Sequence, residues 1–276
     1  MTTATGHQDD PRTATWFRRY TPAGDPALRL ICFPYGGGTP AVYRTWHRWL
    51  PADTEMYAVC YPGRHDRFAD PAAISMEQLA DAIAEAIEPL LDRPFALFGH
   101  SMGAAVAYEV AVRLERRYGA VPVRLFVSGS EAPHKVEHTE EWGKDDETAL
   151  AKVRELGSSA AEVLNDATLL EFLLPTIRAD FRLLDLYRPA PVPVQVGCPL
   201  VAYAGDSDPE CRTELVRGWA DNTRSSFEMR VFPGDHFFLE PLERELLTSV
   251  VGHLQADMRL RRAVLNRTVG PGAGTP

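Results

Sequence analysis

The chain has 276 residues, of which 45% are hydrophobic and 24% charged; this composition supports one large core and excludes a wholly disordered protein. A formal net charge of −9 disfavours nucleic acid or an anionic membrane as the main partner. The first ten residues lack the basic and apolar regions of a secretory signal, and no apolar run reaches the roughly 18 residues of a membrane span. We therefore expect a cytoplasmic protein that binds neither nucleic acid nor membrane.

The first half of the chain alternates between strand and helix patterns. Residues 1–14 are polar and are expected to form a disordered tail. Apolar runs predict an edge strand at 16–20, a central strand at 28–33, and further strands at 55–60, 95–98 and 123–129. Helical patterns fall at 41–50, at 75–91 and from Ala104 to about Tyr118. Ser75 with Gln78 three residues later is typical of a capped helix start.

The alternation stops after Gly129. Residues 130–190 contain only helical or irregular patterns, with helices expected at 147–156 and 166–187 and a kink or break at Pro175. The alternation then resumes with a strand at 199–205, a helix at 210–220, a strand at 227–232 and a helix at 241–260. We expect one discontinuous α/β core (15–129 and 191–262), a helical lid (130–190) and a second disordered tail (263–276).

The four cysteines are widely spaced and include no C-x-x-C pair: Cys32, Cys60, Cys198 and Cys211. Cys32 and Cys60 lie in apolar, strand-like runs, where a thiol packs as a small hydrophobe. The sequence therefore predicts neither a disulfide framework nor a metal site.

The strand at 95–98 runs directly into Gly99-His100-Ser101-Met102-Gly103, a G-x-S-x-G sequence, and a strong helix former follows. Strand, tight turn, serine and helix together are the context of a nucleophile elbow. The two glycines allow the strand and the helix to pack closely across the turn. We expect Ser101 to be a nucleophile; a structural serine in a turn is the alternative.

Three glycines, Gly36 to Gly38, follow the central strand and precede a helix pattern. Such a loop can supply half of an oxyanion hole, and a flexible turn is the alternative interpretation. No G-K-[ST] follows, which argues against a phosphate loop. We expect the backbone N–H groups of Gly36, or a neighbour one position away, and of Met102 to stabilise negative charge.

A serine hydroxyl needs an imidazole to take its proton, and the imidazole needs an acid to orient it. His236 lies in a loop between a strand and a helix and is the preferred base, whereas His100 must point away from the adjacent nucleophile. Asp208 is the preferred acid and Asp206 the alternative. The order Ser101, Asp208, His236 is that of an α/β-hydrolase, with a mostly parallel central sheet flanked by helices.

With these residues assembled, the chain resembles the type II thioesterases of polyketide and non-ribosomal peptide pathways. The matching stretches are 33–38, 61–64, 99–104, 205–209 and 234–239, in order and at family-like spacing. The chain departs from the family pattern in two places. Tyr35 and Gly36 stand where the family usually has His and Ala, and Asp235 stands where it usually has a second glycine.

The resemblance implies hydrolysis of an acyl thioester on the phosphopantetheine arm of a carrier protein. The residues themselves indicate acyl-serine chemistry that needs no cofactor or metal, and we expect a monomer. Carrier proteins of this kind are usually acidic, so docking requires a local basic or apolar site on this acidic chain. The candidate docking residues are Arg18, Arg19, Arg44, Arg48 and Arg64, and an ordinary solvated arginine is the preferred interpretation of each one taken alone.

Two other functions remain open. A hydrolase of small esters or lipids would use the same triad, although residues 137–147 of the expected lid are more polar than a lipase lid. A non-catalytic binding protein on a hydrolase scaffold would be expected to lack at least one of Ser101, the acid and His236.

Overall fold

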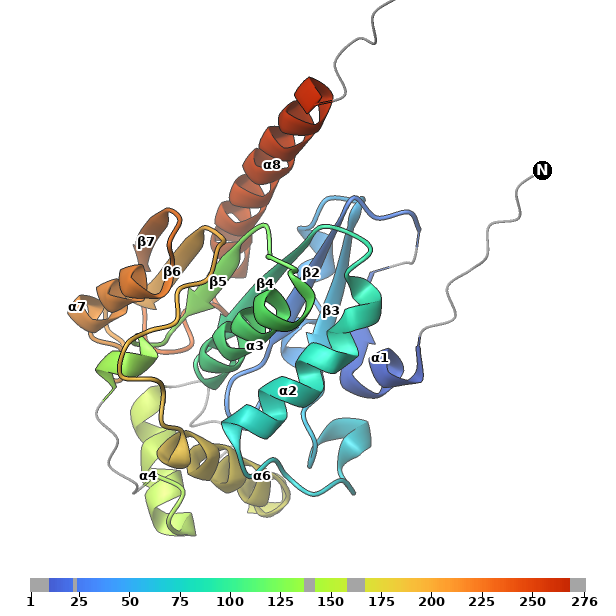
Figure 1. Cartoon of the computed structure of the whole chain (residues 1–276). Helices are drawn as coiled ribbons and strands as arrows, with labels where there is room; N and C mark the ends of the chain where they lie inside the picture. Colours follow the sequence, from blue (N-terminus) through green and yellow to red (C-terminus); the bar gives the residue numbers. More distant parts are fainter. Residues whose placement is uncertain (1–9, 22–23, 137–141, 158–166, 269–276) are drawn as a thin grey trace, which may run out of the picture.

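The computed structural model describes residues 10–21, 24–136, 142–157 and 167–268, and they build one sheet with helices on both faces (Figure 1). The sheet has seven strands in the order β1-β3-β2-β4-β5-β6-β7. The bounds are β1 (Phe17–Arg19), β2 (Leu28–Phe33), β3 (Thr54–Val59), β4 (Phe95–His100), β5 (Leu125–Ser128), β6 (Leu200–Gly205) and β7 (Phe227–Phe232). Among these described strands, only β1 is antiparallel to its neighbour, β3.

The central strands separate two apolar layers. Alternate residues of β2 point to opposite faces, so that Ile31 packs in one core and Cys32 in the other. One core contains the buried faces of α2 (Met76–Ile87) and α3 (Met102–Tyr118). The other contains the buried face of α8 (Glu243–Thr268). All residues of β2, β3, β4 and β6 are buried, as expected for parallel strands covered on both faces.

Two helices lie at the edge of the sheet at which α3 begins (Figure 1). They are α4 (Asp146–Leu156) and α6 (Ala167–Leu186), and both come from the segment between β5 and β6. Pro175 lies inside α6 without ending it. The described part of 130–190 contains no strand.

Short elements account for the main differences from the expected helices. The region expected as a helix at 41–50 forms two 3₁₀ turns, η1 (Pro40–Tyr43) and η2 (Trp46–Arg48). The region expected at 210–220 forms α7 (Thr213–Val216) followed by η6 (Arg217–Asn222). Three further short 3₁₀ turns are η3 (His65–Arg67), η4 (Glu88–Leu90) and η5 (Pro133–Lys135).

The folded part extends further at both ends than expected. A short helix, α1 (Pro11–Trp16), occupies residues assigned to the N-terminal tail, because Asp10 caps it and Pro11 fixes its first turn. α8 continues past residue 262 to Thr268, since its sequence contains no Gly or Pro after Gly252 to end it. The remaining tail residues, 1–9 and 269–276, lie outside the described residues. None of the described helices is long and apolar enough to cross a bilayer.

Candidate active site

Ser101 lies in a strained turn between β4 and α3. Its φ of 54° falls in the left-handed region, which residues other than glycine rarely adopt. A Cβ on Gly99 would clash with the carbonyl of Gly103, and a Cβ on Gly103 would clash with the carbonyls of Phe33 and Pro34. Glycine at both positions therefore lets the strand, the turn and the helix approach closely enough to present the serine.

His236 is held by a buried carboxylate. Its Nδ1 lies 2.8 Å from Asp208 Oδ2, and the Asp208 side chain is fully buried. Because an ionised carboxylate only accepts hydrogen bonds, Nδ1 carries the proton and Nε2 keeps its lone pair. Nε2 is buried and has no hydrogen-bond partner among the described residues. The ring is therefore oriented with its basic nitrogen available.

The two candidate acids have different partners. Asp206 accepts hydrogen bonds from the Gly234 N–H at 3.0 Å and from the Ser207 hydroxyl at 2.9 Å. The pKa of the Asp206 carboxyl is lowered, mainly by the hydrogen bond from the Gly234 N–H. Asp206 thus caps a turn, whereas Asp208 contacts the imidazole. Asp235 accepts from the Phe237 N–H at 2.9 Å, which is also a turn contact.

The described hydrogen-bond partner of the His100 ring is Ser128. Its Nδ1 lies 2.9 Å from Ser128 Oγ, and both residues are fully buried. Its ring centroid lies 5.1 Å from that of His236. The pKa of His100 lies well below its usual value, mainly because the ring is buried and also because His236 lies nearby. His100 is therefore a neutral ring packed behind the candidate base.

The glycine loop forms a tight turn beside the elbow. The Gly38 N–H donates to the Tyr35 carbonyl at 2.9 Å, and Gly37 has a φ of 77°, as the third position of a type II turn requires. The N–H groups of Gly36 and Met102 donate to no described residue. Met102 also begins α3, where the helix dipole favours negative charge.

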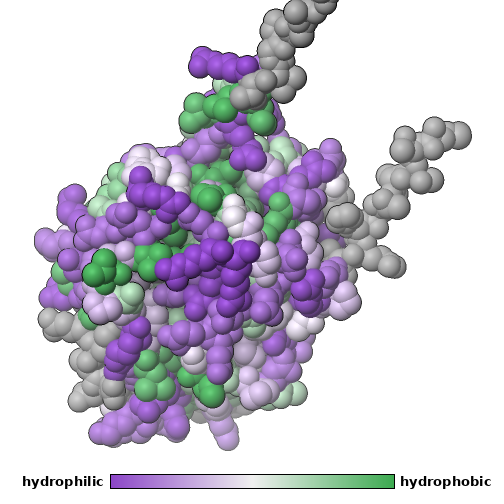
Figure 2. Space-filling model, in the orientation of Figure 1, coloured by the Kyte–Doolittle hydropathy of each residue, from purple (hydrophilic) through white to green (hydrophobic). Residues whose placement is uncertain are grey.

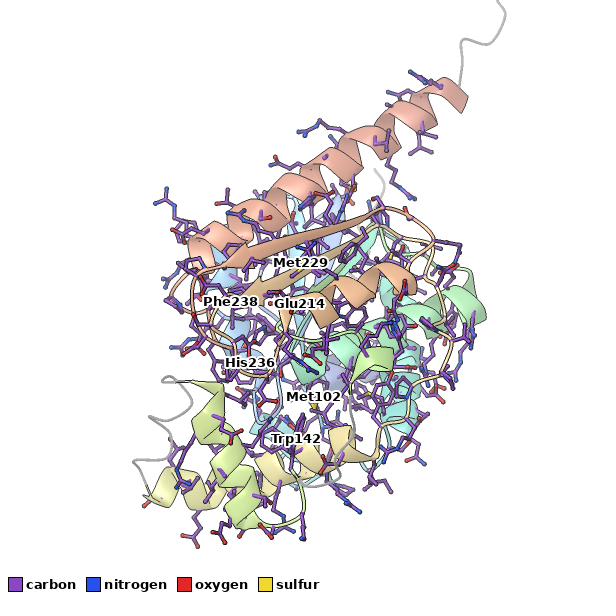
Figure 3. All side chains as sticks on the ribbon, turned by 90° about the vertical axis from the view of Figure 1, so that its left-hand side faces the viewer. Met102, Trp142, Glu214, Met229, His236 and Phe238 are labelled. Atoms are coloured by element: carbon purple, nitrogen blue, oxygen red, sulfur yellow. The ribbon has the colours of Figure 1, made fainter. Side chains whose placement is uncertain are left out.

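A cavity of about 320 Å³ brings three of the predicted residues together: Ser101, Met102 and His236. Gly36 is not part of its lining. Figure 3 shows Met102 and His236 between the sheet and the two helices α4 and α6, with Trp142 on the helix side. The apolar wall includes Trp142, Leu156, Phe181, Leu184 and Tyr187, and the charged groups are Glu131, Lys152, Asp185, Glu210 and Arg212.

Arg64 is not available for docking, which corrects the expectation for this residue. Its side chain is 4% exposed and forms two hydrogen bonds of 2.6 Å to the carboxylate of Asp180 in α6. Sequence reasoning did not single out Asp180. A sequence pattern could have found it: Asp180 is an acidic residue between Ile177 and Phe181, two apolar residues that the helical repeat places on the core-facing side.

Among the described residues, one group could offer three metal ligands: Cys60, His65 and Asp66. The carboxylate of Asp66 already pairs with Arg18. Burial raises the pKa of the Cys60 thiol to about 11, which opposes the thiolate that a metal requires. None of the three lines the cavity, so this group has no connection to the chemistry at Ser101.

The α/β sheet, the serine elbow and the buried His-Asp pair define a serine hydrolase of the α/β-hydrolase class. The chain matches the Thioesterase domain family over residues 28–258. It therefore belongs to the thioesterase family, within the type II thioesterases of polyketide and non-ribosomal peptide pathways, as the sequence motifs predicted.

Individual relatives agree with this assignment. Thioesterase PikA5 of Streptomyces venezuelae is 37% identical over 87% of this chain and 85% of its own length. A probable cadicidin biosynthesis thioesterase of Streptomyces griseus is 39% identical over 83% of this chain. The match spans only 63% of that relative's own length. The structure of the type II thioesterase BorB from the borrelidin cluster matches with a TM-score of 0.79 at 35% identity, covering 87% of this chain and 98% of BorB.

Proposed function

We propose that this chain hydrolyses acyl thioesters on the phosphopantetheine arm of a carrier protein, and so removes stalled or misloaded acyl groups from a synthase. The observation that carries the proposal is the buried His236–Asp208 pair: Nε2 of His236 has no described hydrogen-bond partner, and His236 and Ser101 line the same cavity. The names of the relatives, which are thioesterases of antibiotic biosynthesis, support the choice of a thioester.

In the proposed mechanism, Ser101 Oγ forms a bond to the thioester carbonyl carbon while His236 Nε2 takes the hydroxyl proton. Asp208 holds the ring through Nδ1 and stabilises the imidazolium. The N–H groups of Gly36 and Met102 donate to the oxyanion. The C–S bond then breaks, and the thiol leaves with the proton from His236. His236 Nε2 then takes a proton from a water molecule, which attacks the carbonyl carbon of the acyl-serine. The bond between that carbon and Ser101 Oγ breaks, Oγ regains the proton from His236, and the carboxylic acid leaves.

The charged groups in the cavity favour this reaction over lipid hydrolysis. Lys152 of α4 forms an ion pair with Glu210, and Glu131 pairs with Arg212 at 3.2 Å. A long alkyl chain would have to lie against these groups at the expense of their remaining solvation. A small oxygen ester is the competing substrate. Comparing rates on an acyl-pantetheine thioester and the matched oxygen ester separates the two, and a large preference for the ester overturns our choice.

The proposal includes the division of the chain into a core (15–129 and 191–262) and a lid (130–190). α4 and α6 support it, because they lie at the edge of the sheet that carries Ser101 and supply walls of the cavity. We also propose that the protein acts as a monomer. We propose that the reaction takes place in the cytoplasm, as expected from the sequence.

Replacing the nucleophile tests the proposal directly. We expect Ser101→Ala to abolish acyl release from an acyl-carrier protein and labelling by a fluorophosphonate, while circular dichroism and the unfolding midpoint stay close to wild type. A folded Ser101→Ala protein that still releases acyl groups would show that the nucleophile lies elsewhere.

A further inference from the structure

The glycine turn after β2 is held by a side chain that comes from α6. The Gly37 N–H donates to Asp180 Oδ2 at 2.7 Å, and the Asp180 side chain is only 6% exposed. In α6, Thr176 also donates its hydroxyl to the Gly63 carbonyl at 2.9 Å. α6 therefore bonds to two loops at the carboxyl edge of the sheet, including the one that contains the candidate oxyanion donor.

The hydrogen bond to Gly37 selects one conformation of the turn. Type I and type II turns differ by a flip of the peptide between their two central residues, here Gly36 and Gly37. With glycine at both positions, side-chain sterics do not decide between the two orientations. Asp180 accepts from the N–H of this same peptide. The neighbouring peptide, which carries the Gly36 N–H, is held through the Tyr35 carbonyl by Gly38.

Arg64 fixes the carboxylate and neutralises it. It forms the two hydrogen bonds to Asp180, and its Nη1 also donates to the Gly38 carbonyl at 3.2 Å. An unpaired carboxylate beside an oxyanion hole would raise the energy of the negative charge that develops there. The bidentate pair therefore gives Gly37 a strong acceptor without leaving a net negative charge next to the reaction.

The chain that leads into the turn contacts the elbow on both sides of Ser101. The carbonyls of Phe33 and Pro34 lie so close to Gly103 in α3 that no Cβ fits there. The Tyr35 ring packs edge-on against His100, with centroids 5.9 Å apart. A shift of the turn therefore changes the position of the Gly36 N–H relative to Ser101.

We infer that Asp180, held by Arg64, is a positioning residue for the oxyanion hole, so that the hole is complete only when α6 is seated on the glycine turn. This inference rests on the proposed function, because it assigns the Gly36 N–H to the oxyanion. It assigns Asp180 no contact with the substrate. Its effect therefore falls on the transition state, with little change in the binding of the ground state.

The test replaces the pair as a unit, since removing one partner would leave a buried charge and could unfold the protein. Arg64→Met/Asp180→Leu fills the site with apolar groups and removes the acceptor for Gly37. Arg64→Met/Asp180→Asn restores an acceptor. The control is Arg124→Met/Asp257→Leu, which removes a similar two-bond ion pair at the opposite edge of the sheet.

We expect Arg64→Met/Asp180→Leu to lower kcat at least about tenfold with KM changed less than about twofold, since losing a whole oxyanion donor costs about 10² to 10³. The inhibition constant of an alkyl trifluoromethyl ketone, whose adduct carries an oxyanion, should rise by the same factor. Arg64→Met/Asp180→Asn should recover most of the lost kcat and most of the lost ketone affinity. The control Arg124→Met/Asp257→Leu should change neither kcat nor the ketone affinity.

A folded Arg64→Met/Asp180→Leu protein with kcat and ketone affinity equal to those of the control overturns the inference. If that variant does not fold, Arg64→Lys decides, because lysine keeps the charge but cannot form the bidentate pair. Wild-type kcat and ketone affinity in Arg64→Lys would again overturn it. Failure of the proposed function is distinguishable, since it would appear as residual activity in Ser101→Ala, whatever happens at Asp180.

Discussion

The imidazole of His236 has a single hydrogen-bond partner among the described residues, and that partner is Asp208. We expect Asp208→Asn to lower kcat by up to about 10⁴-fold, because an amide can force the wrong tautomer on the ring. Asp206→Asn is the matched control, since Asp206 bonds to Gly234 and Ser207 instead. Steady-state kinetics on an acyl-pantetheine thioester measure both. Equal losses in the two variants would contradict the assignment of the acid.

The buried His100 makes stability depend on pH. Its pKa is lowered on folding, so below the usual value of about 6.5 the unfolded chain binds a proton that the folded chain does not. The folded state is therefore favoured less as the pH falls through that value. We expect the urea unfolding free energy to decrease less steeply in His100→Asn than in wild type between about pH 7.5 and about pH 5. Identical slopes would refute this prediction.

At the scale of elements, α3 packs so closely on the end of β2 that an added methyl group does not fit between them. Gly103→Ala would place a methyl against the carbonyl oxygens of Phe33 and Pro34, and we expect it to lower the unfolding midpoint strongly. Gly252→Ala is the control, because the exposed Gly252 in α8 has nothing within 4 Å of an added Cβ. It should raise stability by about 0.8–1 kcal/mol. Thermal unfolding of both variants tests the contrast.

The strands were predicted more closely than the short helices, for a physical reason. Strands such as Leu28–Phe33 and Phe227–Phe232 are bounded by turn residues and match their predicted limits. In the region expected as a helix at 41–50, Tyr43 and Trp46 are three residues apart and both buried. Spacing of three fits a 3₁₀ turn as well as an α-helix, and ten residues are too few to separate the two periods.

The candidate site was predictable where one loop carries the chemistry, as at Ser101 and His236. Asp180 and Arg64 were not predictable as a pair, because they lie 116 residues apart and no sequence motif contains both of them. Their partnership arises only when α6 is placed against the turn. Sequence motifs therefore predict the candidate reacting groups, and the fold is needed to find the Arg64–Asp180 pair beside them.

At the scale of the whole molecule, charge decides how a partner approaches. The net charge is −9, and the face in Figure 2 is mostly hydrophilic with small hydrophobic spots. Of the five candidate docking arginines, Arg64 is buried and Arg18 is paired with Asp66. An acidic carrier protein should therefore be repelled at long range.

We expect KM for an acyl-carrier protein to fall when salt is raised from about 20 to about 200 mM, because ions screen this repulsion. The free acyl-pantetheine, which lacks the protein's charge, is the control and should show no such change. A KM for the carrier that rises with salt would mean that a local basic site dominates docking.

The neighbouring strands β5 and β6 pair along their length, yet the whole of 129–199 separates them in the chain. The entropy cost of closing such a loop grows only logarithmically, by about 0.6 kcal/mol for each doubling of its length. The sheet therefore tolerates large changes in the length of this one segment. Since α4 and α6 also wall the cavity, exchanging that segment is a route by which a recombined gene could acquire a new acyl preference while inheriting the same catalytic core.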